Sequence, residues 1–350
     1  MKISEPLISW YLRHKRDLPW RDTRDPYKIW LSEIILQQTR VDQGMEYYLR
    51  FVNTYPNIGL LSNASRDEVL KNWQGLGYYS RARNLHETAI YINNSLGGKF
   101  PATYSSLLDL KGVGPYTAAA IASFAFKLPH AVVDGNVSRV IARIFDIELP
   151  INGTEGAKTI RKAADDCLNR EHPDLHNQAM MELGALVCTP QKPGCTICPL
   201  ADQCLARYRN TVSSRPVKLK KAKQKLRYMH YAVLETTEGI VFRLRGEKDI
   251  WQGLNDFVSL EGKEQVSAPD LADFLKSEFP DMNLDKVPGA PEYECTHQLT
   301  HRRIEARFWR FVVSGNLPEG ETYKIVNRND IDSVPVPVLV HKYLLNGEWL

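Results

Sequence analysis

The sequence lacks a long apolar run. Its most apolar stretch, residues 118–126, is rich in alanine and far shorter than the roughly eighteen residues that a membrane-spanning helix needs, so it predicts a buried helix. The N-terminus has no basic segment followed by an apolar core, and we therefore expect no export signal but a cytoplasmic protein, associated with the nucleoid if bacterial. Cysteine is also scarce, with six residues, and we expect no structural disulfides in such a compartment.

What remains is the composition of an ordinary globular chain. The 350 residues include 43% hydrophobic and 25% charged residues, which excludes a disordered or fibrous protein and predicts about two domains. The net charge of +4 is local, because residues 210–228 contain seven lysines and arginines and no acid. We interpret this basic segment as an interdomain linker between one domain at 1–209 and another at 229–350. Whether it is merely solvated or neutralises phosphates stays open.

The two parts follow different patterns. Residues 1–209 show helical periodicity nearly throughout, which predicts an all-α domain. Within it, Ser65 and Glu68 precede an apolar run, as at a helix start, and a glycine-containing turn at 112–114 predicts helix, hairpin, helix. The second part should be an α+β domain, with one amphipathic helix at 271–279. Its predicted strands are residues 229–235, 239–244, 257–260 and 304–313.

Four of the six cysteines lie close together. Their spacing is C-x6-C-x2-C-x5-C, and they are Cys188, Cys195, Cys198 and Cys204. Four thiolates on short loops suit either an iron-sulfur cluster or tetrahedral zinc, and ligand softness does not choose between the two. The isolated Cys167 and Cys295 are interpreted as packing residues.

Two further local features bear on function. Gly112 and Gly114 allow a tight turn beside the start of the next helix, where exposed amides form an anion site, although a glycine hairpin alone is a weak signal. Glu33 lies three residues after Trp30 on an apolar helical stripe, so we do not expect its carboxyl to be fully exposed.

These features occur together, and in this order, in a known family. The hairpin at 110–114, the acidic Asp134 and the cysteine spacing resemble the endonuclease III superfamily of helix-hairpin-helix DNA glycosylases. Within it, the chain is most similar to the MutY-type adenine DNA glycosylases, which remove adenine mispaired with 8-oxoguanine. The resemblance covers residues 5–209 and, more loosely, the C-terminal domain. It is carried by residues 18–21, 30–39, 73–79 and 177–181.

The resemblance implies a chemistry in which adenine leaves the sugar after its ring is protonated. In the family, the acid that protonates N7 lies where Glu33 lies, and the carboxylate that stabilises or captures the oxocarbenium ion lies where Asp134 lies. Tyr116 stands where bifunctional relatives carry a Schiff-base lysine, so a monofunctional enzyme that leaves an abasic site is implied. Tyr116 and Asn136 are expected to support Asp134. Without the resemblance, either acid would be interpreted as a structural or surface group.

The same resemblance implies where DNA and cofactor bind, since the target base must be flipped out of the duplex. Residues that match the adenine pocket, for which core packing is the alternative at the apolar positions, are Arg16, Trp20, Arg21, Leu36, Val41, Gln178 and Met181. Those that match the intercalating and lesion-contacting group are Gln38, Thr39, Leu76 and Tyr78. The hairpin glycines are expected to contact DNA. The four clustered cysteines are expected to bind one 4Fe-4S cluster that holds a DNA-binding loop.

The C-terminal domain resembles the Nudix-like domain with which MutY-type proteins read the 8-oxoguanine strand, most clearly at residues 251–257. The helix at 271–279 lacks the acidic hydrolase signature that binds magnesium, so pyrophosphatase activity is not expected. The lesion-recognition loop of relatives, an aromatic residue followed by Ser and His, aligns with Leu299, Thr300 and His301. An aliphatic side chain therefore replaces the stacking aromatic.

We expect a base-excision repair enzyme that removes adenine opposite 8-oxoguanine, and also opposite guanine, by hydrolysing its N-glycosidic bond. The enzyme is expected to be a monomer that binds duplex DNA and does not associate with a membrane. A glycosylase of the same fold for mismatched thymine or oxidised pyrimidines is one alternative; the C-terminal domain, Glu33 and Tyr116 argue against it together. The other is a catalytically idle protein that only recognises damage, and the presence of Glu33 and Asp134 argues against it.

Overall fold

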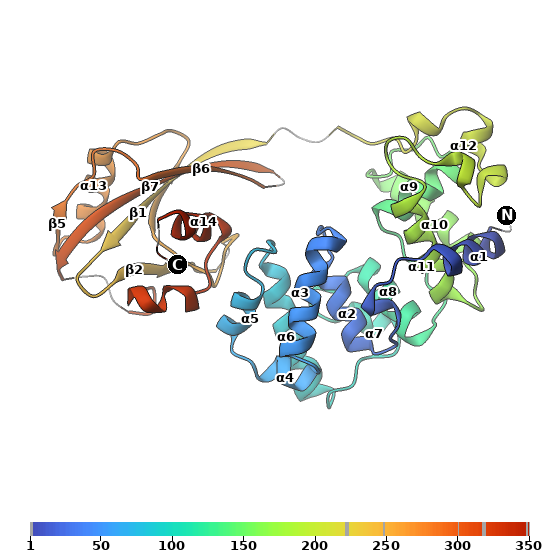
Figure 1. Ribbon diagram of the computed structural model, residues 1–350, viewed down its shortest axis with the longest axis horizontal. Coiled ribbons are helices and arrows are strands. Elements are labelled where there is room, and N and C mark those ends of the chain that lie inside the picture. The colour runs from blue at the N-terminus through green and yellow to red at the C-terminus, as the bar shows by residue number, and fades with distance from the viewer. Residues whose placement is uncertain are drawn as a thin grey trace. The chain divides into compact units, whose positions relative to one another are not determined.

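The computed structural model describes residues 3–220, 224–247, 249–299, 301–316, 320–347 and 349 (Figure 1). Within these ranges the first part of the chain consists of helices and turns, and strands begin at Lys225. An all-α domain followed by an α+β domain was predicted, and both are confirmed. No helix among the described residues is long and apolar enough to cross a membrane.

The helical part is built from short helices joined by tight turns. Single 3₁₀ turns occur at Pro19–Arg21, Cys195–Ile197, Ala201–Gln203 and Val212–Ser214. The α-helices are α1 (Ser4–His14), α2 (Pro26–Ile35), α3 (Val41–Thr54), α4 (Ile58–Asn63), α5 (Arg66–Asn72), α6 (Ser80–Ser95), α7 (Tyr104–Leu108), α8 (Pro115–Phe126), α9 (Gly135–Ile144), α10 (Thr154–Cys167), α11 (Pro173–Leu186) and α12 (Leu205–Tyr208).

The predicted helix, hairpin, helix is formed by α7, the turn after it and α8. Thr103 caps α7 by accepting a hydrogen bond from the Ser106 amide at 3.2 Å. Gly112 has a φ of 77°, in the left-handed region that favours glycine, and Pro115 starts α8 at a position where its missing N–H costs nothing. The predicted capping box is also present, because Ser65 and Glu68 exchange hydrogen bonds at the start of α5.

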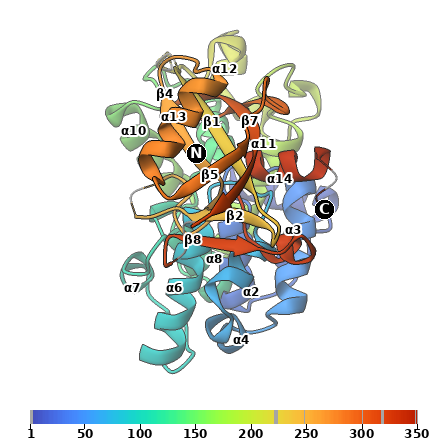
Figure 2. The same ribbon diagram turned by 90° about the vertical axis from the view of Figure 1, so that its left-hand side faces the viewer.

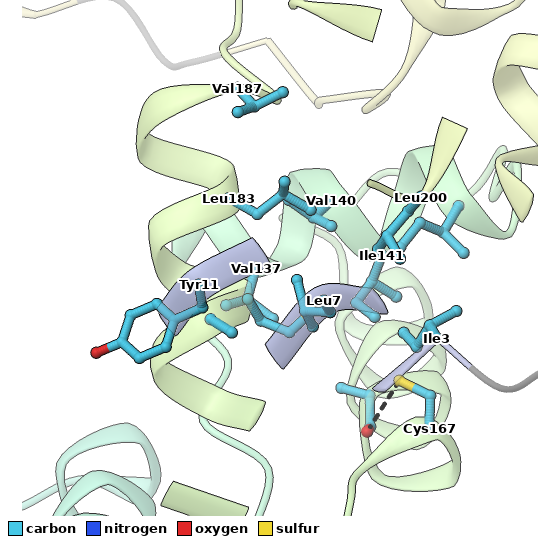
Figure 3. Packing of buried hydrophobic residues seen from close by; sticks show 14 of the residues in the cluster. Ile3, Leu7, Tyr11, Val137, Val140, Ile141, Cys167, Leu183, Val187 and Leu200 are labelled. Atoms are coloured by element: carbon cyan, nitrogen blue, oxygen red, sulfur yellow. Dashed lines mark hydrogen bonds between the residues drawn. The ribbon is translucent and has the colours of Figure 1, made fainter. Parts of the chain in front are cut away.

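Helix α9 lies at the centre of a core that fixes where its N-terminus sits. Figure 3 shows Leu7 and Tyr11 of α1 beside Val137 and Ile141 of α9, with side chains of α11 on the same cluster. Cys167 belongs to this cluster and its thiol donates to the Ala164 carbonyl at 3.4 Å, which confirms its interpretation as a packing residue. The core therefore gives the first turn of α9 a rigid support.

The second domain is organised by one mixed sheet. Strands β1 and β7 run parallel through its centre, from Lys225 paired with Arg302 to Glu235 paired with Val312, and the other pairings are antiparallel. The path through the sheet is β3-β2-β1-β7-β5, with β4 on β1, β6 on β7 and β8 on β2. The strands are β1 (Lys225–Glu235), β2 (Ile240–Leu244), β3 (Asn255–Asp256), β4 (Val258–Gly262), β5 (Met282–Lys286), β6 (Tyr293–Gln298), β7 (Arg302–Gly315) and β8 (Tyr323–Val326).

Two helices cover the two faces of this sheet (Figure 2). Helix α13 (Ala268–Glu278) packs Leu271 and Leu275 against the face that carries Phe311. Helix α14 (Val338–Asn346) lies on the other face, where Tyr343 stacks on Phe308 with ring centroids 4.6 Å apart. Strand side chains alternate between faces, so neighbouring apolar residues of β7 reach different helices.

The strand predictions located the centre of this sheet better than its periphery. The strand predicted at 229–235 begins earlier, at Lys225, and the one predicted at 257–260 corresponds to β4, which starts at Val258 and continues to Gly262. Strands β3, β5, β6 and β8 and helix α14 were not predicted. In β5 and β6 exposed polar residues alternate with partly buried ones, so neither has the apolar run that marked the central strands.

Parts of the basic segment 210–228 have defined positions. Arg215 is buried and forms ion pairs with Asp146 and Glu148 at 2.8 and 2.6 Å, and the Ile151 amide donates to the Val217 carbonyl at 3.0 Å. Lys225 and Arg227 already belong to β1. Lys221 and Lys223 lie outside the described residues.

The described chain packs as two compact units, and each contains two stretches of sequence. One comprises Met1–Asn63 and Glu87–Lys220, and the other comprises Ala64–His86 and Lys221–Leu350. Helix α5 and the turn that follows it therefore pack with the second domain, which begins at β1 and is called the sheet domain below. In the sequence, they lie between helices of the first domain.

Candidate active site

Helix α2 buries the first candidate acid. Asp25 caps the helix by accepting from the Tyr27 amide at 2.9 Å, and Pro26 occupies its first position. The helix is apolar on nearly every side, so Glu33 is only 7% exposed, as predicted from its spacing to Trp30.

Burial changes the acidity of this carboxyl. It raises the pKa of Glu33 to about 7, while a hydrogen bond from the Tyr116 hydroxyl opposes the rise and the negative charge of Asp134 adds to it. Tyr116 follows the hairpin as the second residue of α8, and burial raises its own pKa well above the ordinary value. A carboxyl in this state exchanges a proton near neutral pH.

Asp134 is the N-cap of α9. Its Oδ1 accepts from the Val137 amide at 2.7 Å, and its Oδ2 accepts from the Asn136 side-chain amide at 3.0 Å. Burial raises the pKa of Asp134 above its ordinary value, and these two hydrogen bonds, with the charge of Arg139, limit the rise. Donors that favour the ionised form hold this carboxylate in place at a helix N-terminus.

A hydrogen-bonded chain extends from Asp134 to the cysteine-containing loop. Asn136 Oδ1 accepts from Arg139 Nη2 at 2.9 Å, and the same guanidinium donates to the carbonyl oxygens of Gly184 and Cys188, both at 2.7 Å. At Gly184 a Cβ atom would lie 2.7 Å from Asn136 Cβ. Only glycine therefore lets α11 approach α9 closely enough for this chain to form.

The two acids open into one cavity of about 230 Å³. Besides Glu33, Asp134, Tyr116 and Asn136, every residue matched to the adenine pocket lines it: Arg16, Trp20, Arg21, Leu36, Val41, Gln178 and Met181. Thr39 lines it as well. The apolar members Trp20, Leu36, Val41 and Met181 are only partly buried, and they form the wall of the cavity.

The sequence analysis missed one charged residue of this cavity, Glu182. It is fully buried on α11 and accepts hydrogen bonds from Arg16 Nη2 at 2.7 Å and from Arg21 Nη2 at 2.6 Å. Burial opposes its ionisation, but the hydrogen bonds from the two arginines prevail and lower the pKa of Glu182 to about 2. Helical spacing from Gln178 would have located it, because residues four apart share a helix face. The other lining residues that were missed are Leu18, Ile29, Ser32, Phe124 and Ala185.

The remaining predicted DNA contacts lie outside this cavity lining. Gln38 has a φ of 57° and is exposed at the turn after α2. Leu76 is buried, and Tyr78 is 48% exposed with a φ of 50° in the turn after α5. Leu299 and His301 flank the turn between β6 and β7, and Thr300 lies outside the described residues.

The four clustered cysteines line a common cavity between the end of α11 and α12. Arg143 is buried beside them and donates to Cys188 Sγ at 3.3 Å and to the Thr189 carbonyl at 2.7 Å. Burial raises the pKa of the Cys198 thiol to about 11, with the other cysteines contributing. Among the described residues no three Cys, His, Asp or Glu side chains converge tightly enough to hold a single metal ion.

Comparison with known proteins shows to which family the chain belongs. A family model described as HhH-GPD superfamily base excision DNA repair protein matches residues 31–168, and a NUDIX domain model matches residues 230–346. An adenine DNA glycosylase of Buchnera aphidicola subsp. Baizongia pistaciae (strain Bp) is 36% identical over 255 residues, which cover 71% of this chain and 71% of that protein. The chain belongs to the adenine DNA glycosylase family.

The chain is also similar to a human adenine DNA glycosylase and to a solved glycosylase structure. The adenine DNA glycosylase of Homo sapiens is 44% identical over 212 residues, which cover 58% of this chain and 39% of that protein. The solved structure of a thermostable thymine-DNA glycosylase is 31% identical with a TM-score of 0.54, and it covers 59% of this chain and 95% of that chain. The chain is therefore a helix-hairpin-helix glycosylase of base excision repair with an appended Nudix-like domain, as predicted.

Proposed function

We propose that the protein hydrolyses the N-glycosidic bond of adenine mispaired with 8-oxoguanine, and also with guanine, and leaves an abasic site. The observation that carries this proposal is the pair of acids in one cavity. Burial raises the pKa of both acids, to about 7 for Glu33, but at Asp134 two hydrogen-bond donors and the charge of Arg139 favour the ionised form. Two acids whose environments differ in this way suit an acid and an anion in the same reaction.

The reaction assigns one role to each acid. Glu33 donates its proton to N7 of the flipped adenine, and the bonding electrons of the glycosidic bond leave with the base. The positive charge that develops on the sugar faces the Asp134 carboxylate, which is fixed by Val137 and Asn136. Water then adds its hydroxyl to the sugar carbon and releases a proton, which returns Glu33 to its acid form.

Strand cleavage is not part of this reaction. Tyr116 occupies the position from which an amine would attack the sugar, and a phenol does not form an imine. Its hydroxyl is already engaged with Glu33. We therefore assign Tyr116 to holding the Glu33 carboxyl in position, and we propose that the product is an intact strand with an abasic site.

DNA binding is assigned to three groups of residues. Gly112 and Gly114 are exposed at the turn before α8, whose N-terminus favours phosphate, and a Cβ at Gly114 would meet no atom within 4 Å. Gln38, Thr39, Leu76 and Tyr78 are assigned to holding the duplex open, and Leu299, Thr300 and His301 to reading the lesion. We propose a monomer acting on duplex DNA.

We also propose that Cys188, Cys195, Cys198 and Cys204 hold one 4Fe-4S cluster. Four thiols on a common cavity form a complete ligand set for such a cluster. Arg143 supplies a buried positive charge at the same place, which would offset the negative charge of thiolate ligands. When bound, the cluster would hold the loop at 188–204 in place, and it would take no part in the chemical steps that release adenine.

The proposal is tested by incubating the purified protein with labelled duplexes and then treating them with alkali. The duplexes carry adenine opposite 8-oxoguanine, guanine or thymine, and one carries thymine opposite guanine. Alkali-dependent cleavage at mispaired adenine supports the proposal. Cleavage at thymine would replace it with the activity named for the related thymine-DNA glycosylase structure. Binding without cleavage would favour a protein that only recognises damage.

A further inference from the structure

The stretch Ala64–His86 is attached to the sheet domain by specific contacts. Arg83 Nη1 donates to the Gln252 carbonyl at 2.8 Å, and Lys71 forms an ion pair with Asp332 at 3.0 Å. These contacts join α5 and α6 to the loop before β3 and to the segment before α14. The stretch is therefore held by a domain that begins more than a hundred residues later in the sequence.

One residue of the sheet domain provides the inner part of this anchor. Val336 is buried between Pro335 and Pro337, and both of its backbone groups bind the stretch. Its carbonyl accepts from the Tyr79 hydroxyl at 3.2 Å, and its amide donates to Gln74 Oε1 at 3.3 Å. The preceding residue is fixed in turn, because the Asn255 amide donates to the Pro335 carbonyl at 2.9 Å.

Gln74 and Tyr79 bracket a tight turn. Gly75 and Gly77 have φ values of 94° and 77°, and the Gly75 amide donates to the Tyr79 hydroxyl at 3.3 Å. Trp73 Nε1 and Arg81 Nη2 both donate to the Gly77 carbonyl at 3.0 Å. The turn is thus hydrogen-bonded at both ends.

The residue presented by this turn is Tyr78. Its side chain is 48% exposed, and its φ of 50° is unusual for a residue with a bulky side chain. An exposed aromatic ring on a rigid turn is suited to stacking against nucleic acid bases. Gln74 and Tyr79, at the two ends of the turn that carries Tyr78, are the residues bound to Val336.

We propose that Gln74 and Tyr79 are positioning residues through which Val336 of the sheet domain sets the turn that presents Tyr78 to the duplex. This inference rests on the proposed function. The same domain also holds the turn between β6 and β7, because the Lys225 amide donates to the His301 carbonyl at 3.1 Å and Gln224 Nε2 donates to the Leu299 carbonyl at 2.7 Å. One domain then fixes both turns, so its engagement with DNA is coupled to opening of the base stack.

The test compares three variants of the full-length protein. Gln74→Ala and Tyr79→Phe each remove a bond to Val336, and Lys71→Ala removes an exposed ion pair between the same two parts, which is expected to contribute little. The substrate is an adenine:8-oxoguanine duplex with 2-aminopurine beside the target adenine, and its fluorescence reports unstacking in the saturated complex.

For Gln74→Ala and Tyr79→Phe we expect the fluorescence rise and the single-turnover excision rate at saturation to fall by about three- to tenfold, the size of one lost hydrogen bond. Lys71→Ala should match the wild type. Unaltered fluorescence and rate in both Gln74→Ala and Tyr79→Phe, with their thermal unfolding unchanged, would overturn the inference. A fall in affinity alone, with normal fluorescence at saturation, would also overturn it. If the wild type excises no adenine, the proposed function fails instead, and the fluorescence comparison still decides whether the turn is positioned by Val336.

Discussion

The guanidinium of Arg139 donates a hydrogen bond to the backbone carbonyl of Cys188 at 2.7 Å. Through Asn136 the same guanidinium is connected to the carboxylate of Asp134. We expect a displacement of the loop at Cys188 to be transmitted to Asp134, the carboxylate proposed to face the sugar. Because α9 is packed rigidly on its core side, the movement would alter the side chains of its first turn rather than the whole helix.

Replacing Arg139 by leucine should slow excision without abolishing DNA binding. The Asn136 side-chain amide would lose the hydrogen bond that fixes its orientation. Asp134 would then lose a well-oriented hydrogen-bond donor and a nearby positive charge. We expect the single-turnover rate to fall by about tenfold or more, since misplacement of a catalytic group is costly. Rapid-quench measurements on saturated complexes check this. Lys162→Met, which removes an exposed ion pair on α10, is the matched control. A normal rate in Arg139→Leu would show that Asp134 is held well enough by Val137 alone.

Replacing Glu33 by glutamine should separate binding from chemistry. The amide fills the same space but has no acidic proton to give to the base. We expect mismatch affinity to stay near the wild-type value and the excision rate to fall by about a hundredfold to ten-thousandfold, the usual contribution of a general acid. Gel-shift titration and single-turnover kinetics measure the two quantities. A near-normal rate would remove Glu33 from the mechanism.

The excision rate should depend on pH through Glu33. Since the protonated form is the active one and its pKa is raised to about 7, the rate should fall by about tenfold for each pH unit above that value. The hydrogen bond from Tyr116 stabilises the carboxylate and so lowers this pKa. Tyr116→Phe should therefore shift the alkaline limb of the pH–rate profile to higher pH. An unshifted limb, or one displaced to lower pH, would contradict this assignment.

Borohydride should trap little protein on the DNA. Reduction captures an imine, and Tyr116 has no amine with which to form one. Tyr116→Lys places an amine at that position and serves as the positive control for trapping. Denaturing gels of the reduced mixtures give the covalent fraction. Abundant trapping by the wild type would reveal another amine at the sugar.

The resemblance to the glycosylase family located most of the cavity, because the motifs that carry it are continuous in the sequence and each falls within or beside one helix. Glu182 was not among the matched residues, although its spacing of four from Gln178 places both on one face of α11; its pairing with two arginines distant in the sequence was not predictable. Nothing in the sequence indicated that residues 64–86 pack with the sheet domain, because contacts such as that of Tyr79 with Val336 join parts far apart in the chain. Strand β6 was not predicted for a different reason: its exposed polar residues alternate with partly buried ones, so it has no apolar run. Patterns within one element were predictable, and pairings between distant elements were not.

Glu182→Gln should destabilise the helical domain. Arg21 would remain nearly buried without a counter-charge, while Arg16, whose side chain is 36% exposed, would be partly solvated. We expect the free energy of unfolding to fall by roughly 3 kcal/mol, at the lower end for a broken buried pair. The pKa of Glu182, lowered to about 2 from an ordinary 4.5, adds a pH signature: its stabilisation is present above pH 4.5 and is lost as the pH falls through about 2. Chemical denaturation followed by far-ultraviolet circular dichroism at several pH values measures both effects. Glu46→Gln, which removes an exposed pair with Arg50, is the control. Equal stability of Glu182→Gln and the control at neutral pH would mean that the two arginines find solvent or another acid once Glu182 is neutral.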